Sequence, residues 1–177
     1  MGKQKQEGKF KVGDKVFYPA HGAGTVQDIR DIDFAGEVQS YYEFKFVNNE
    51  LTISTPVDNV ERLKVRKIHD AKEIEKAIKK LKKQPSIEPS TENYNEIMNL
   101  IKNKDISGDI NAFIEIIQIC NRVKEVRYED GRLIPSSITK NTKNAISYLV
   151  GELSLAKDIS YDESEKHFIK LSGLPIE

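Results

Sequence analysis

The feature that most constrains this chain is a change in the spacing of its apolar residues near residue 66. Before that point apolar and polar side chains alternate, as in residues 42–46, which is the two-residue period of a half-buried β-strand. After it the apolar residues recur at i, i+3, i+4 and i+7, as in residues 74–81, which is the period of an amphipathic helix. The sequence therefore predicts a strand-rich N-terminal part and a helical C-terminal part.

The N-terminal part, from Phe10 to about Arg66, predicts four or five short antiparallel strands separated by tight turns. The expected strands cover residues 15–18, about 25–33, 40–47 and 51–55. Asn48 and Asn49 are expected to form a two-residue hairpin turn, because asparagine tolerates the left-handed conformation that such turns need. Short strands of this kind favour a small SH3-like or Tudor-like barrel, in which the sheet closes on itself and hides its edges.

The C-terminal part predicts four amphipathic helices around residues 74–81, 94–101, 110–117 and 146–153. Pro85 and Pro89 separate the first two helices, and a capping-box spacing that begins at Ser160 predicts a fifth, short helix to about Leu171. The expected class is thus α+β in two domains. Residues 1–9 are expected to be a disordered tail, residues 10–66 the barrel and residues 67–177 the helical domain.

Composition narrows the classes of function. The formal net charge of the 177 residues is zero, which argues against a general coat of positive charge but allows a local basic patch. A single cysteine can form neither an internal disulfide nor a cysteine zinc cluster, and this fits a reducing cytoplasm. No run approaches the roughly 20 apolar residues of a membrane span, and the first nine residues lack the apolar core of a secretion signal. A cytoplasmic protein without a membrane partner is expected.

No constellation of residues points to catalysis. His21, His69 and His167 lie in different predicted elements and have no partner at metal-ligand spacing. The esterase elbow G-x-S-x-G, the phosphate-binding P-loop and the dinucleotide motif G-x-G-x-x-G are all missing from the sequence. We therefore expect no enzyme activity, no metal, no cofactor and no small-molecule substrate.

A lysine-rich stretch follows the change of period. Between Lys64 and Lys83 nine basic residues stand against Asp70, Glu73 and Glu75. Such an excess attracts phosphates, but a solvated helix face with i, i+4 support such as Glu75–Lys79 explains it equally well. A second, looser basic set comprises Arg122, Lys124, Arg127, Arg132, Lys140 and Lys143.

Three blocks of sequence resemble one known family. The run Phe10-Lys11-Val12-Gly13-Asp14-Lys15-Val16-Phe17-Tyr18-Pro19-Ala20-His21-Gly22-Ala23-Gly24 resembles the opening of the domain shared by CarD, CdnL and the transcription-repair coupling factor. Residues 56–63 with 65–68 resemble the close of that domain. Ser107-Gly108-Asp109 and residues 149–156 resemble the helical domain of the stand-alone CarD and CdnL proteins.

The resemblance implies a division of labour between the two domains. In this family the barrel binds the β subunit of RNA polymerase, and the helical domain contacts promoter DNA at the upstream edge of the transcription bubble. The resulting complex favours the open promoter, so the protein is associated with the nucleoid through the polymerase. No covalent chemistry is required.

The resemblance also implies particular contact residues. The polymerase-binding positions correspond to Ile32, Phe34, Ile53, Ser54 and Thr55, and the arginines of some relatives are replaced here by Ile32 and Ser54. Docking is therefore expected to rely on backbone pairing and apolar contact. The DNA-binding positions correspond to Tyr94, Arg122, Lys124, Lys140 and Lys143.

Tyr94 occupies the position at which many family members have a tryptophan wedge, and this chain has no tryptophan. Its ring either inserts at a base step or continues the apolar stripe of its own helix as a core residue. Two other functions remain alternatives: a KOW-like module that binds RNA or the ribosome, and a polymerase adaptor that does not bind DNA.

Overall fold

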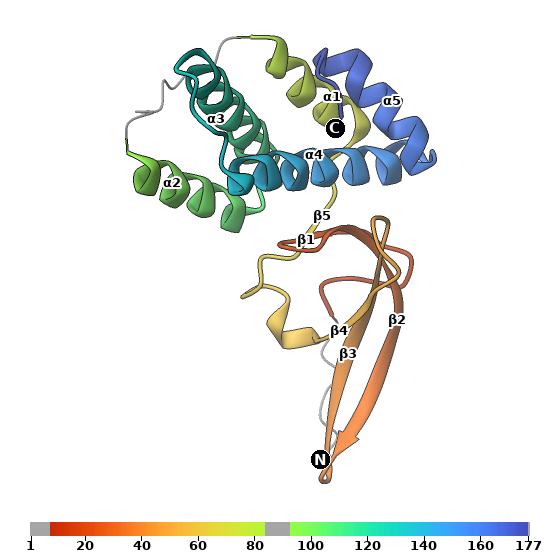
Figure 1. The fold of residues 1–177 in the computed structure, drawn as a ribbon. Helices are drawn as coiled ribbons and strands as arrows, with labels where there is room; N and C mark the ends of the chain where they lie inside the picture. The colour runs from red at the N-terminus through yellow and green to blue at the C-terminus, as the bar shows by residue number, and fades with distance from the viewer. Residues whose placement is uncertain (1–7, 84–92, 177) are drawn as a thin grey trace.

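The computed structural model describes residues 8–83 and 93–176, which form two lobes (Figure 1). We call residues 8–69 the sheet lobe and the rest of the described chain the helical lobe. The sheet lobe holds one antiparallel sheet and the helical lobe holds five α-helices. The predicted α+β class is confirmed. Residues 1–7 of the predicted disordered tail, together with Pro85 and Pro89, lie outside the described residues.

The sheet has the strand order β4-β3-β2-β1-β5. Its strands are β1 (Lys15–Tyr18), β2 (Gly22–Phe34), β3 (Glu37–Phe46), β4 (Thr52–Pro56) and β5 (Arg66–Lys67). Alternating side chains of these strands, among them Val16, Tyr42 and Phe44, form a buried cluster that Phe10 closes from below. The backbone N–H of Phe10 donates to the Tyr42 hydroxyl over 2.9 Å, which holds the incoming chain against the sheet.

The closed barrel expected from the sequence does not form. Strands β4 and β5 are the two edges of the sheet, and no pairing joins them within the described residues. Two residues of β5 are too few to close a barrel, and the 3-10 turn Val57–Asn59 with the buried Val60 and Val65 covers the open side instead. The outer edge of β4 consequently has no strand partner in the described structure.

The turns also differ from the prediction. The two-residue turn expected at Asn48 and Asn49 is a five-residue loop, residues 47–51, between β3 and β4. The tight turn lies instead at Ala35 and Gly36, whose φ angles of 54° and 87° are those of a left-handed two-residue hairpin turn. Strands β2 and β3 therefore extend beyond the rest of the sheet as a long two-stranded hairpin (Figure 1).

The helices are α1 (Ala71–Lys79), continued by the 3-10 turn Lys80–Lys82, α2 (Tyr94–Ser107), α3 (Ile110–Glu129), α4 (Ser136–Lys157) and α5 (Tyr161–Ser172). The predicted capping box at Ser160 is present, and Asp70 with Glu73 forms a second one. Helix α4 lies against α1, α3 and α5 and carries the most buried residues of the helical core (Figure 1).

Phe17 belongs to strand β1 but is buried in the core of the helical lobe. Its ring centroid lies 5.2 Å from that of Phe113 on α3 and 5.5 Å from that of Tyr148 on α4. The alternation of β1 sends Val16 and Tyr18 into the sheet core and Phe17 to the opposite side. A single strand thus contributes to both cores, and this joins the two lobes.

Candidate functional site

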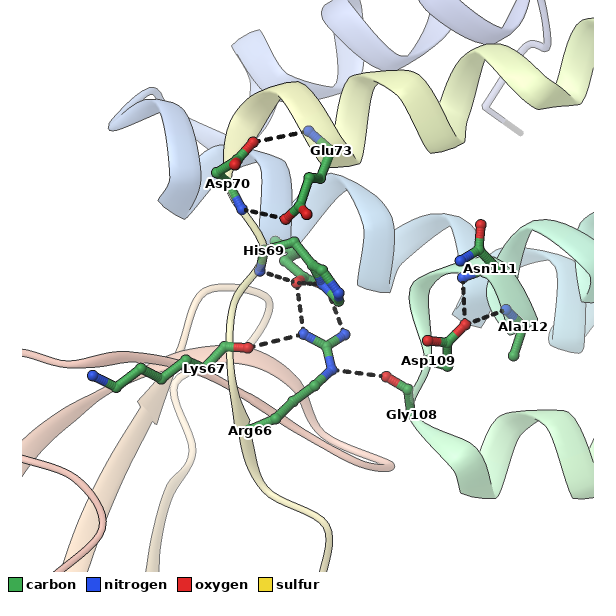
Figure 2. Close-up of polar contacts among 10 residues, drawn as sticks. Arg66, Lys67, His69, Asp70, Glu73, Gly108, Asp109, Asn111 and Ala112 are labelled. Atoms are coloured by element: carbon green, nitrogen blue, oxygen red, sulfur yellow. Dashed lines mark hydrogen bonds and ion pairs between the residues drawn. The ribbon is translucent and has the colours of Figure 1, made fainter.

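The contact between the lobes is centred on a buried ion pair (Figure 2). Arg66 of β5 holds the carboxylate of Glu152 on α4 with two hydrogen bonds of 2.7 and 3.1 Å. The same guanidinium donates to the Gly108 carbonyl over 3.0 Å and stacks 4.6 Å above the centroid of the Phe17 ring. Since the Glu152 side chain is fully buried, this pair links the connecting strand to α4 and to the start of α3.

His69 completes the environment of Glu152. Its backbone N–H and its ring Nδ1 lie 2.8 and 2.9 Å from the same carboxylate oxygen. Burial alone would raise the pKa of Glu152, but the hydrogen bonds from His69 and Arg66 outweigh it and lower that pKa. In return, the hydrogen bond to Glu152 raises the pKa of His69 against the opposing effect of burial.

Further contacts hold the lobes at a fixed angle. Lys15 of β1 donates to the Leu155 carbonyl over 2.7 Å and pairs with Asp158 over 2.5 Å. The Asn48 side chain donates to the Ser147 carbonyl over 3.2 Å. At Gly151 a Cβ atom would lie 3.0 Å from the Val47 side chain, so a larger residue there would require Val47 of the β3–β4 loop to shift.

We call these contacts between the two lobes the hinge, although they hold the lobes rigidly. The hinge explains why the resemblance extends to residues that had no assigned contact. Arg66, Gly108 and Glu152 each lie in one of the sequence blocks that resemble the family, and the structure brings all three together. Sequence reasoning gave them no role. The available signal was a glutamate inside the apolar stripe of α4, because a buried carboxylate requires a cationic partner.

The predicted polymerase-binding residues fall on two faces of the sheet. The register pairs Phe34 with Glu37 and Ser54 with Glu43, which places Ile32, Phe34 and Ser54 on the outer face. Ile53 and Thr55 pair with Phe44 and Tyr42 and lie on the inner face. Thr55 is buried, and its hydroxyl lies 3.2 Å from that of Tyr18, so only the backbone of Thr55 reaches the β4 edge.

The tip of the β2–β3 hairpin is apolar and acidic. Phe34 and Val38 are 81% and 67% exposed, and Ile32 is 43% exposed. Ile32 and Phe34 line one surface hollow near the turn. Between residues 27 and 50 the carboxylates are Asp28, Asp31, Asp33, Glu37, Glu43 and Glu50, against Arg30 and Lys45. An exposed apolar tip with an acidic surround is typical of a protein-binding surface.

The predicted DNA-binding lysines are partly brought together. Lys124 of α3 and Lys143 of α4 line one pocket of about 260 Å³, whose apolar wall includes Ile146 and Ile176. Lys140 is exposed one turn before Lys143 on α4. Arg122 is not among the lining residues of that pocket and pairs with Glu125 over 3.5 Å.

Tyr94 is half-buried at the first turn of α2. Its ring packs against the helical core, its hydroxyl is hydrogen-bonded to that of Ser137 on α4, and the Arg127 guanidinium lies 5.9 Å above the ring centroid. These contacts favour the core interpretation of Tyr94 over the wedge. They also place Tyr94 beside the start of α4, where Lys140 follows Ser137 by three residues.

Two strongly exposed apolar residues near Tyr94 were missed by sequence reasoning. Tyr128 at the end of α3 and Leu133 in the next loop are 82% and 91% exposed. The loop is held by local hydrogen bonds, since the Arg127 guanidinium donates to the Leu133 carbonyl over 3.0 Å and the Arg132 backbone N–H donates to the Arg127 carbonyl over 2.7 Å. The sequence did contain a signal for this surface, because Tyr128 and Leu133 are an aromatic residue and a leucine that lie outside the apolar stripe of α3.

No group of three or more histidine, cysteine or acidic side chains in residues 8–83 and 93–176 is placed to hold a metal ion. None of the helices in that part of the chain is both long and apolar enough to span a bilayer.

The comparisons with known proteins agree with this geometry. Residues 10–69 match the family model of the CarD-like/TRCF RID domain. The sheet lobe is therefore similar to the CarD-like/TRCF RID domain. The chain is also 25% identical over 151 residues to the "Putative transcription factor YdeB" of Bacillus subtilis (strain 168), a match that covers 85% of this chain and 94% of that protein.

The predicted resemblance is thereby confirmed. The RID match ends at His69, the residue that contacts Glu152, so the hinge lies where the RID domain meets the helices. The alignment with YdeB is longer than the sheet lobe and extends into the helical lobe. Together the two similarities support a role in transcription.

We expect the protein to lose much stability when only one partner of the Arg66–Glu152 ion pair is removed. Arg66→Met leaves a buried carboxylate without its main partner and should lower the free energy of unfolding by about 3–5 kcal/mol in urea titrations. Arg66→Met with Glu152→Met should recover a large part of that loss. Lys157→Met removes the half-exposed pair with Glu75 and serves as control, with an expected loss below about 1 kcal/mol. Equal losses for Arg66→Met and Lys157→Met would contradict this account of the hinge.

The raised pKa of His69 predicts a pH dependence. Stabilisation by protonated His69 is fully present below its unfolded pKa of about 6.5 and is lost as pH rises through the higher folded value. The pKa of Glu152 is lowered, so its own contribution does not change at and above pH 6. Wild-type thermal stability should therefore fall between pH 6 and pH 9 by more than that of His69→Gln, which donates without titrating. Parallel curves for the two proteins would rule out this linkage.

Proposed function

We propose that this protein regulates transcription initiation by binding the β subunit of RNA polymerase with its RID domain and promoter DNA with its helical lobe. The observation that carries the proposal is the RID match over residues 10–69, combined with an open β4 edge and an exposed apolar hairpin on that same domain. The YdeB similarity supports the same general role for the longer chain.

The polymerase-binding surface proposed here is the β4 edge with the outer face of the β2–β3 hairpin. An edge strand offers unpaired backbone N–H and C=O groups to a strand of another protein, whatever the side chains are. Ser54 is exposed on this edge, and Ile32 and Phe34 supply apolar area on the same face of the sheet. Ile53 and Thr55 contribute through their backbone, since their side chains face the inner side.

The DNA-binding surface proposed here lies at the end of the helical lobe where α2 and α4 begin. Lys140 and Lys143 are exposed along the first turns of α4, and Lys124 lies across the pocket from Lys143. These charges, together with Arg122 on α3 outside that pocket, contact phosphates rather than base edges, so binding should be salt-sensitive and largely independent of sequence. Tyr94, Tyr128 and Leu133 provide the apolar part of this end.

The two surfaces act together because the hinge fixes the angle between the lobes. A regulator that binds the melted promoter complex more tightly than the closed one shifts the equilibrium by that difference, and each 1.4 kcal/mol changes it about tenfold. With a flexible joint, part of this difference in binding free energy would be lost to fixing the two lobes in one orientation. The Arg66–Glu152 pair and the buried Phe17 have already fixed their orientation.

Phe34→Asp is expected to weaken capture of the polymerase β subunit by at least about tenfold, because it places a charge where apolar area should be buried. Val12→Asp is a matched control, since Val12 is also exposed on the RID domain but lies away from the hairpin. Affinity is measured with immobilised protein and purified core polymerase. Unchanged capture by Phe34→Asp would remove this face from the proposal.

Tyr128→Ala is expected to shorten the lifetime of the open promoter complex by about tenfold, within the 1–3 kcal/mol that aromatic stacking on a base contributes. Tyr94→Phe keeps the ring and loses only the hydroxyl bonded to Ser137, so it should behave nearly as wild type. Lifetimes are measured by competitor challenge on one promoter.

A shorter lifetime of the open complex for Tyr94→Ala, with no effect of Tyr128→Ala, would show that Tyr94 rather than Tyr128 is the aromatic residue that contacts a base. The packing of Tyr94 favours a second candidate function, an adaptor that binds polymerase without contacting DNA. Unchanged lifetimes for every variant at this end, including Lys140→Gln with Lys143→Gln, would establish that second function.

A further inference from the structure

The part of the lysine-rich stretch that follows residue 70 forms one exposed surface on α1 and the turn after it. Residues 71–83 contain six lysines and two glutamates, and all six lysines are exposed. Ile74, Ala77 and Ile78 face the helical core. Lys72, Lys76 and Lys79 follow the i, i+4, i+7 spacing, which places them along the opposite side of the helix.

The acidic side chains of this segment are engaged elsewhere. Asp70 and Glu73 form the capping box at the start of α1. Glu75, which the sequence offered as an i, i+4 partner for Lys79, pairs with Lys157 of α4 over 2.6 Å. Lys80 donates to the neutral side chain of Asn111 over 2.6 Å. None of the ion pairs between described residues includes a lysine of residues 71–83.

Helix stability does not account for the whole stripe. Lys76 and Lys79 lie in the last turn of α1, where cations favour the negative end of the helix dipole. Lys72 lies in the first turn, where a cation faces the positive end and is unfavourable. Helix α5 packs beside α1, and its C-terminal half adds the exposed Lys166 and Lys170 (Figure 1). The acidic Asp162, Glu163 and Glu165 belong to the first two turns of α5.

The zero net charge of the chain therefore hides a charge separation. The acidic β2–β3 hairpin and the lysine surface on α1 lie at opposite ends of the molecule (Figure 1). A molecule held by polymerase at its acidic end presents its most basic helix to the side away from that contact. The chemistry that such a surface recognises is a line of phosphates.

We propose that the α1 surface formed by Lys72, Lys76, Lys79, Lys82 and Lys83 is a second DNA-binding surface that holds the phosphate backbone of the upstream duplex. This inference rests on the proposed function, which supplies DNA as the polyanion. Lys72 and Lys79 are about 10 Å apart along the helix at 1.5 Å per residue. One DNA strand advances about 3.4 Å along the duplex axis per phosphate, so this length spans about three phosphate steps and the three lysines can each reach a different phosphate of one strand.

The test is the salt dependence of binding of the full chain to a 30-base-pair DNA duplex. Each phosphate neutralised by a protein cation contributes about 0.9 to the slope of log K against log salt. Lys76→Gln with Lys79→Gln should therefore reduce that slope by about 2. The control, Lys11→Gln with Lys45→Gln, removes two exposed lysines from the RID domain and should leave the slope unchanged. Glutamine is a good helix former, so α1 is retained in the first variant.

An unchanged slope in the Lys76 and Lys79 variant overturns the inference. If Lys140→Gln with Lys143→Gln still lowers the slope, the proposed DNA-binding end survives that result. Failure of the wild-type chain to bind the duplex at any salt concentration overturns both the α1 surface and the DNA half of the proposed function, while polymerase capture tests the other half separately. Loss of binding to phosphatidylglycerol vesicles, with duplex binding intact, would reassign the lysines to a membrane and also overturn the inference.

Discussion

The structure depends on one buried carboxylate in the middle of a helix. Glu152 is fully buried on α4, and its cost of desolvation is offset only because Arg66 and His69 reach it from the strand and linker that end the RID domain. Those partners come from a different lobe, so the ion pair can form only at one relative placement of sheet and helices. The apolar contact of Phe17 with Phe113 and Tyr148 would tolerate sliding, whereas the bidentate geometry of Arg66 does not. Apolar packing therefore stabilises the contact between the two lobes, and the ion pair fixes the angle between them.

A fixed angle matters for a protein whose proposed binding surfaces lie at its two ends. The hairpin tip and the α1 surface are separated by the whole length of the molecule, and their charges are opposite in sign. Opposite charges at the two ends orient the protein between an apolar or basic protein surface and a polyanion before either contact is complete. The composition alone argued only against a general coat of positive charge and left a local basic patch open.

The sequence predicted those parts of the structure that local spacing determines. The change of period near residue 66, the five helices and the capping box at Ser160 are properties of neighbouring residues and were found correctly. The closed barrel was wrong because closure depends on the length of β5, and a two-residue strand leaves almost no periodic signal. The tight turn at Ala35 was missed because alanine rarely adopts a positive φ. The division of Ile53 and Ser54 between two faces required the register of β4 on β3, and the partner of Glu152 required the tertiary fold.

The open edge of β4 supports the view that this protein works in a complex. An unpaired edge strand invites aggregation, and proteins that act alone usually protect it with a charge, a proline or a covering loop. Here Pro56 ends the strand and the hairpin twists away beyond it, but Ser54 and Thr52 leave the edge polar, uncharged and accessible. An arginine at Ser54 would add a side-chain contact to a partner and would also hinder pairing with another copy. In the proposed polymerase contact its absence leaves recognition to the backbone of β4 and to the apolar residues of the hairpin.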